Sequence, residues 1–100
     1  MSRALTLVIT RDVNSRYRGF LRSAMAEIAS GIYVSTQLNS DARDRLYEVI
    51  REWHETLNSG SITMIWRDKD AAADIGIRCL GTTQKDFCDV DGFLLTRKKK

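Results

Sequence analysis

The sequence is short of the residues on which most metal sites and nucleophilic active sites depend. It contains one histidine and two cysteines among 100 residues. Cys79 and Cys88 are close in sequence but His54 lies far from both, so no paired set of zinc ligands can be assembled. No Ser-His-Asp arrangement and no phosphate-binding glycine loop is visible. His54 is therefore expected to be a surface residue near the end of a helix.

Long apolar runs and a second domain are also missing. No segment approaches the roughly 20 apolar residues of a membrane-spanning helix, so no membrane partner is expected. Proline is absent, and no repeat interrupts the chain. We expect one domain, residues 1–96, followed by a basic tail, residues 97–100. Without a signal-peptide pattern, two reduced thiols in a soluble cytoplasmic protein are expected, although two cysteines also allow one disulfide.

The charge is only mildly positive. The formal net charge is +3, and the terminal RKKK, residues 97–100, holds four of the positive charges. The rest of the chain is nearly neutral. An anion-binding surface must therefore come from local clustering of basic residues and not from bulk charge.

The first half of the chain predicts one strand and one helix. Residues 4–10 are β-branched and aliphatic, which is typical of a buried strand. From Arg16 onward, apolar residues recur at the i, i+3, i+4 and i+7 positions of a helix face. Ser15 is expected to cap this helix, and the pair at residues 30–31 is expected to end it because glycine accepts the left-handed conformation.

The remainder predicts one more helix and four strands. The helix is expected to begin near residue 41, with Ser40 as its cap, and to end at residues 58–60. Its buried face is predicted to hold Leu46, Val49, Ile50, Trp53 and Leu57. The predicted strands are residues 32–36, 61–66, 74–81 and 93–96, the second and third forming a hairpin and the last following a turn at Asp91 and Gly92.

This order of elements is typical of an α+β fold. Two helices on one face of an antiparallel sheet come closest to the ferredoxin-like plan. The strand at residues 93–96 is short, apolar and terminal, so we expect it to add to the edge of a partner subunit's sheet. The sequence therefore predicts a homodimer with terminal strand exchange.

Asp12, just after the first strand, has two interpretations. It is either a solvated turn residue or a Mg²⁺ ligand, since a twofold dimer would bring two copies of one acid face to face. A single acid in each chain supplies few ligands for a catalytic metal ion. The other candidate acids, Asp68, Asp70 and Asp74, lie on a different loop and would approach only through folding.

Three arginines, Arg16, Arg18 and Arg22, lie in the first turns of the predicted first helix. Cations are unfavourable at that end of the helix dipole, which suggests another use. One interpretation is that guanidinium groups and free N–H groups there bind the phosphates of a nucleic-acid backbone. The alternative is that these arginines are solvated or pair with acids such as Glu27.

Five segments together resemble a known family. They are LVITRDVNSRYRGFL, ASGIYVS, LYEVIREWHE, SITMIW and DVDGFLL. Together they resemble the CRISPR-associated protein 2 family, type I-E branch, from Leu5 to Leu95. The resemblance implies a ferredoxin-like homodimer that bridges two dimers of the integrase subunit, CRISPR-associated protein 1. It also implies that this dimer positions a double-stranded DNA for spacer acquisition.

The resemblance also implies roles for particular residues. Arg16 and Arg18 match arginines that contact the DNA backbone. Lys85 matches a basic residue of a second contact loop, whose neighbouring basic position is Gln84 here. The segment from Gly92 onward resembles the part that docks on the integrase subunit. The candidate partner-binding residues are Phe93, Leu94, Leu95 and Thr96.

Asp12 matches an acid that binds a metal, Mg²⁺, in some family members and is credited with endonuclease activity. Here Arg11 precedes it, and a neighbouring cation would compete with Mg²⁺. A DNA-binding scaffold subunit of the adaptation complex is the favoured function. The alternatives are a toxin-like, Mg-dependent endonuclease that uses Asp12 on RNA or DNA, and a ferredoxin-like regulatory module.

Overall fold

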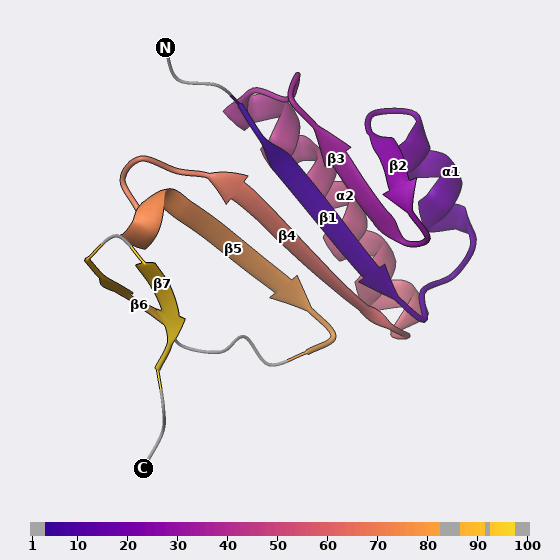
Figure 1. Cartoon of the computed structure of the whole chain (residues 1–100). Helices are drawn as coiled ribbons and strands as arrows, with labels where there is room; N and C mark the ends of the chain where they lie inside the picture. The colour runs from indigo at the N-terminus through magenta and orange to yellow at the C-terminus, as the bar shows by residue number, and fades with distance from the viewer. Residues whose placement is uncertain (1–3, 83–86, 92, 98–100) are drawn as a thin grey trace.

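The strand predicted at the start of the chain lies in the middle of a sheet. The computed structural model describes residues 4–82, 87–91 and 93–97. β1 (Thr6–Arg11) pairs antiparallel with β3 (Ile32–Ser35) on one side and with β4 (Ser61–Arg67) on the other. Five strands form this sheet in the order β2-β3-β1-β4-β5, and all its pairings are antiparallel (Figure 1).

The α+β, ferredoxin-like class predicted from the sequence is confirmed. The remaining elements are α1 (Arg16–Arg22), β2 (Ala26–Ala29), α2 (Ser40–Leu57), the 3₁₀ helix η1 (Ala72–Asp74), β5 (Ile75–Leu80), β6 (Phe87–Val90) and β7 (Phe93–Thr96). The predicted hairpin of β4 and β5 is present, with η1 in the loop between them. The last two strands pair with each other and form a separate hairpin (Figure 1).

The predicted first helix is wrong in its second half. α1 ends at Arg22, and residues 26–29 form the edge strand β2, which pairs with β3 across the turn at Ser30 and Gly31. Ile28, expected on the buried helix face, is 61% exposed. The apolar spacing fits helix and strand alike over so short a stretch, and pairing with β3 decides between them. Gly31, with φ +77°, serves the hairpin turn instead of ending a helix.

The side chains that cap the two helices differ from the predictions, although α1 begins at Arg16 as expected. Asn39, not Ser40, caps α2, because its extended backbone lets Oδ1 accept a hydrogen bond of 2.8 Å from the Ala42 N–H. Ser15 occupies the cap position of α1, but its side chain makes no capping bond. Instead Asn14 Oδ1 accepts from the Arg16 N–H at 2.9 Å. Neither these helices nor any other in the described residues is long and apolar enough to cross a bilayer.

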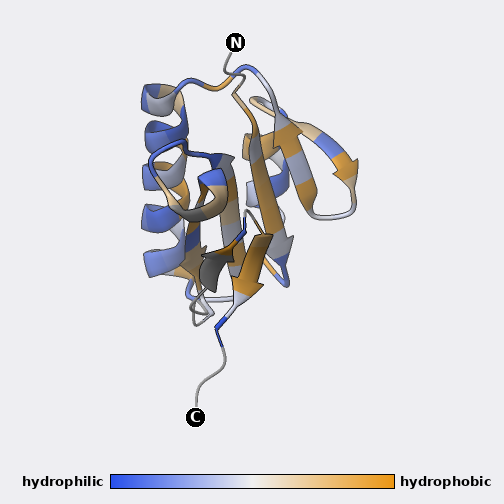
Figure 2. Cartoon of the chain, turned by 60° about the vertical axis from the view of Figure 1, so that its left-hand side comes forward, coloured by the Kyte–Doolittle hydropathy of each residue, from blue (hydrophilic) through white to orange (hydrophobic). Residues whose placement is uncertain are grey.

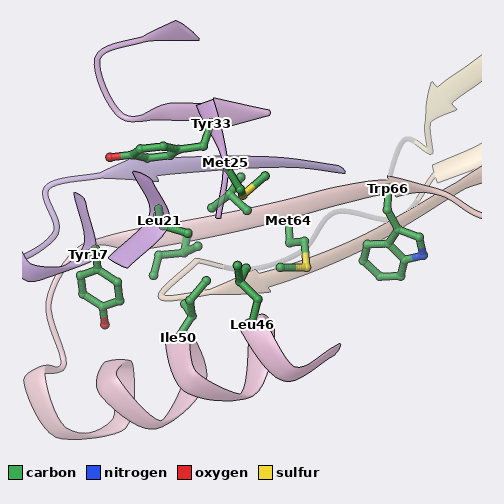
Figure 3. Close-up of a cluster of buried hydrophobic side chains, with 10 residues drawn as sticks. Tyr17, Leu21, Met25, Tyr33, Leu46, Ile50, Met64 and Trp66 are labelled. Carbon is green, nitrogen blue, oxygen red and sulfur yellow. The ribbon is translucent and has the colours of Figure 1, made fainter. Parts of the chain in front are cut away.

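The core lies between the helices and one face of the sheet (Figure 3). Tyr17 and Leu21 from α1 and Leu46 and Ile50 from α2 are buried there. Of the predicted buried face of α2, Trp53 and Leu57 are half-buried against this core, and Val49 is half-buried. Burial raises the pKa of Tyr17. Among the described residues its hydroxyl is the one fully buried side-chain polar atom without a hydrogen-bond partner.

The opposite face of the sheet, which we call the open face, is apolar and carries no helix in the described part of the chain (Figure 1). Successive side chains of a strand alternate between faces, so the neighbours of buried Val8 and Met64 point to this side. One cross-strand row consists of Ala26, Val34, Leu7, Ile65 and Ile77. A second row consists of Ile32, Ile9, Thr63 and the free thiol Cys79.

None of these open-face residues is buried. By contrast, the outer side of α2 is hydrophilic (Figure 2). A sheet with one apolar face against helices and a second apolar face in solvent is unusual for a monomer, because large exposed apolar patches mark interaction sites.

The predicted terminal strand, residues 93–96, is present as β7, and its partner β6 was not predicted. Three apolar side chains of this hairpin, Val90, Phe93 and Leu95, are 46%, 69% and 47% exposed. The hairpin contacts η1, and these three side chains remain exposed. Addition of β7 to the sheet of a second subunit stays a prediction.

Candidate nucleic-acid interface

The loop between β1 and α1 places Asp12 at one end of the sheet. Asp12 is exposed and adopts a left-handed backbone, with φ +56°. Gly60, at the start of β4, packs directly against this turn: a Cβ there would overlap the carbonyl oxygens of Asp12 and Arg11. The conformation of Asp12 is therefore fixed by the close approach of a neighbouring loop.

Asp12 opens onto a small polar pocket of about 260 Å³. Its lining residues are Thr10, Asp12, Val13, Asn14, Ser15, Arg18, Glu27, Ser30, Gly31 and Tyr33. The walls of the pocket come from the end of β1, the loop before α1, α1 itself, β2, β3 and the turn between these two strands. Folding thus brings Arg18 and Asp12 to one cavity, together with Glu27.

Four exposed arginines lie within 12 residues of the sequence, at the end of β1 and on α1, and Arg18 lines this pocket. This group, which we call the arginine cluster, consists of Arg11, Arg16, Arg18 and Arg22. The first turn of α1 holds no acid. Because α1 has only seven residues, its dipole adds little to anion binding, and the guanidinium groups themselves must supply the attraction.

Arg18 pairs with Glu27, as the alternative interpretation of the arginines proposed. The Arg18 Nε donates to Glu27 Oε1 at 3.0 Å, and the two side chains are 64% and 13% exposed. Glu27 Oε2 also accepts from the Gly31 N–H at 3.2 Å. This backbone bond first, and Arg18 after it, hold the pKa of Glu27 below its usual range. Glu27 therefore stays ionised and orients Arg18, whose terminal nitrogens have no hydrogen bond to other described residues.

Arg16 is ordered by an aromatic ring instead of an acid. Its guanidinium lies 5.4 Å from the centroid of Trp53, on α2. Trp53 also makes edge-to-face contacts with Tyr17 and Phe20 of α1, at centroid distances of 5.4 and 5.1 Å. Neither Arg16 nor Arg22 has an ion pair with another described residue. Their charges are therefore available to an external anion.

A Mg²⁺ ion would fit this pocket only in part. Magnesium uses one or two carboxylates together with waters and phosphate oxygens. In the described part of the chain no three acidic, histidine or cysteine side chains gather in a cluster. Glu27, the other carboxylate of the pocket, is occupied by Arg18 and Gly31. One chain thus supplies the Asp12 carboxylate, and a second ligand would have to come from another subunit.

The remaining predicted residues lie elsewhere. Lys85, its neighbour Gln84 and Gly92 fall outside the described residues. Phe93 and Leu95 are exposed on β7, beside the half-buried Leu94 and the exposed Thr96. Figure 1 places this hairpin on the opposite side of the molecule from α1. His54, in the last turn of α2, has its Nε2 3.3 Å from the Gly60 carbonyl oxygen.

One basic group was missed by sequence reasoning. Arg43 lies over the ring of Trp66, with its guanidinium carbon 4.6 Å from the centroid. Arg78 lies between Tyr47 and Trp66, at 4.8 and 5.5 Å from their centroids. The residues come from α2, β4 and β5, so only the tertiary fold brings them together. No local spacing in the sequence signals this contact.

Comparison with known protein families gives a match over most of the chain. A family model described as "CRISPR-associated protein (Cas_Cas2CT1978)" matches residues 5–95. No curated protein matches the chain.

Proposed function

The chain belongs to the CRISPR-associated Cas_Cas2CT1978 family, and we propose that it is a DNA-binding scaffold subunit of the type I-E spacer-acquisition complex. In this role two copies bridge dimers of the integrase subunit and hold the middle of a foreign DNA duplex. The family is Cas2-like, in agreement with the resemblance of the sequence. The scaffold role, the branch and the partners are the parts we propose.

The arginine cluster is the observation that carries this proposal. Four exposed arginines lie at the end of β1 and on α1, and one of them, Arg18, is paired with an acid. Arg16 and Arg18 are also pre-ordered, by Trp53 and Glu27 respectively. Ordered arginines lose less conformational freedom on binding and suit the bidentate geometry of phosphate. Such contacts position a duplex without reading its sequence.

The open face supports a homodimer. One of its two rows runs across all five strands and the other across four, and packing against a second copy would remove them from water. The exposed side chains of the β6–β7 hairpin supply a further apolar surface, for the second subunit and for the integrase subunit. A twofold dimer would carry two arginine clusters, which gives a duplex two points of attachment.

Removal of Arg16 or Arg18 is expected to weaken duplex binding to a similar degree for unrelated sequences. Each phosphate contact that is lost should lower the slope of log affinity against log salt concentration by about 0.9, and a substitution in a homodimer removes two such contacts. Fluorescence anisotropy of Arg16→Ala and Arg18→Ala between low and moderate salt measures both quantities. Arg45→Ala is the matched control, because Arg45 is exposed on α2 and outside the cluster. Slopes equal to that of the wild type would contradict the proposal.

A second candidate function is a Mg-dependent endonuclease that uses Asp12. The supporting observation is the exposed Asp12 in one pocket with Arg18. Asp12→Asn is the suitable variant, because asparagine also accepts a left-handed backbone. For a scaffold we expect Asp12→Asn to keep full spacer integration with the integrase subunit and Mg²⁺. Loss of integration from an assembled complex, or loss of Mg-dependent cleavage of RNA or DNA, would favour the endonuclease.

A further inference from the structure

Glu27 is an acid in direct contact with the arginine cluster. It lies on the edge strand β2, and its carboxylate is bonded to Arg18 of α1. The charge of Arg22 also lowers the pKa of Glu27, after the Gly31 N–H and Arg18. A negative charge at this place repels phosphate groups. Its position within a surface for nucleic acid therefore requires a physical explanation.

The carboxylate of Glu27 is anchored to the backbone of the sheet. Oε2 accepts from the Gly31 N–H at 3.2 Å, which leaves Oε1 for Arg18. Gly31 is itself fixed to β1, because its carbonyl oxygen accepts from the Thr10 N–H at 2.7 Å and from the Thr10 hydroxyl at 3.0 Å. Across the hairpin Glu27 pairs with Tyr33, which is 2% exposed. Glu27 is therefore held at the turn between β2 and β3.

Arg18 uses one of its three guanidinium nitrogens in this contact. Its Nε donates to Glu27 Oε1 at 3.0 Å, and its two terminal nitrogens have no hydrogen bond to any described residue. The side chain of Arg18 is 64% exposed, against 13% for Glu27. A guanidinium is planar and carries its five N–H donors in a fixed fork. An anchored acid at Nε therefore restricts the plane of the fork and leaves the terminal donors free.

We propose that Glu27 is a positioning residue for duplex binding: it holds Nε of Arg18 while the two terminal nitrogens of Arg18 bind one phosphate of the DNA backbone. This role rests on the proposed scaffold function, in which the arginine cluster binds the duplex. The acid then strengthens binding despite its charge. The reason is that a guanidinium already held in place loses less conformational freedom when it binds the phosphate.

Glu27→Gln tests the sign of this effect. Glutamine has one acceptor oxygen, so it cannot accept from both Arg18 Nε and the Gly31 N–H in this arrangement. We expect fluorescence anisotropy to show binding weakened by about fivefold for each cluster on the duplex, about half of the rotamer entropy of an arginine. In the Arg18→Ala background the same substitution should not weaken binding further. Glu52→Gln, which removes an exposed acid of α2 outside the cluster, should bind like the wild type.

Arg18→Lys separates positioning from charge. Lysine keeps the positive charge, but its single ammonium group cannot hold Glu27 and bind a phosphate through two nitrogens. We therefore expect Arg18→Lys to lose most of the affinity that Arg18→Ala loses. Because the side chain of Arg18 is exposed, this variant should keep the wild-type circular dichroism spectrum even where Glu27→Gln perturbs the hairpin.

The Nε–H signal of Arg18 in NMR spectra reports the contact directly. We expect its chemical shift to change little when the duplex is added, and to move toward that of a solvated arginine in Glu27→Gln. Three results would each overturn the positioning role: wild-type or tighter binding by Glu27→Gln, wild-type binding by Arg18→Lys, or an Nε–H signal that moves with DNA as it does in Glu27→Gln. None of these contradicts the scaffold function, which fails instead if Arg16→Ala and Arg18→Ala keep the wild-type affinity and salt slope.

Discussion

Gly60→Ala is expected to lower the free energy of unfolding by about 2–4 kcal/mol and to displace Asp12. Gly60 has φ +74°, which is strained for alanine, and its new Cβ would overlap the carbonyl oxygens of Asp12 and Arg11. Both contacts are with backbone, so no side-chain rotation relieves them. Urea denaturation measures the destabilisation, and the amide chemical shift of Asp12 reports the displacement.

Gly19→Ala is the matched control for this substitution. Gly19 lies inside α1, and a Cβ there would meet no atom within 4 Å. Alanine is favoured over glycine in a helix by about 1 kcal/mol, so this variant should be as stable as the wild type or more stable. A Gly60→Ala protein with wild-type stability and an unshifted Asp12 amide would contradict the prediction, because it would show that the loop accommodates the added Cβ.

The contact between Gly60 and the turn at Asp12 is one of several close backbone contacts in this region. A Cβ at Gly81 would overlap the Gly60 carbonyl oxygen, which also lies 3.3 Å from His54 Nε2. The ends of β1, α2 and β5 and the start of β4 therefore meet at closely packed backbone. These contacts fix the backbone at Asp12. Its left-handed conformation therefore has a structural cause that is independent of any catalytic role.

The elements that the sequence predicts well are those with a strong local pattern. α2 has a long amphipathic repeat, and its predicted start and end lie within one residue of the observed ones. β1 and β4 are continuous apolar strands bounded by polar loops. β2 was missed because Ala24, Met25 and Ile28 satisfy a helical spacing, while its strand character depends on pairing with β3.

The candidate site was predictable in its residues but not in its contacts. The exposure of Arg16, Arg18 and Arg22 follows from their charge. Whether Glu27 pairs with Arg18 depends on the turn at Gly31, which the wrongly extended helix concealed. Likewise, Trp53 was expected in the core, but its position under Arg16 depends on how α1 packs against α2. Tertiary geometry, and not residue type, decides these partners.

The open face leads to the second large prediction: Ile65→Arg is expected to weaken self-association by at least about 100-fold. Ile65 lies in an apolar row with Leu7 and Ile77, on the three strands β1, β4 and β5. Burial of one such side chain contributes about 1.5–3 kcal/mol, and a twofold interface contains the substitution twice. Arginine would also place two buried like charges in the interface. Sedimentation velocity over a range of concentrations measures the change.

Val49→Arg separates this effect from a general response to a new charge. Val49 is also half-buried but lies on α2, on the other side of the sheet, so this variant should dimerise like the wild type. Ile65→Arg should keep a wild-type circular dichroism spectrum, because its side chain leaves the helix-facing core intact. The monomer should bind duplex DNA more weakly and with a lower salt slope, since it carries one arginine cluster in place of two. A wild-type protein that sediments as a monomer, or an Ile65→Arg protein that remains a dimer, would mean that the open face is not the interface.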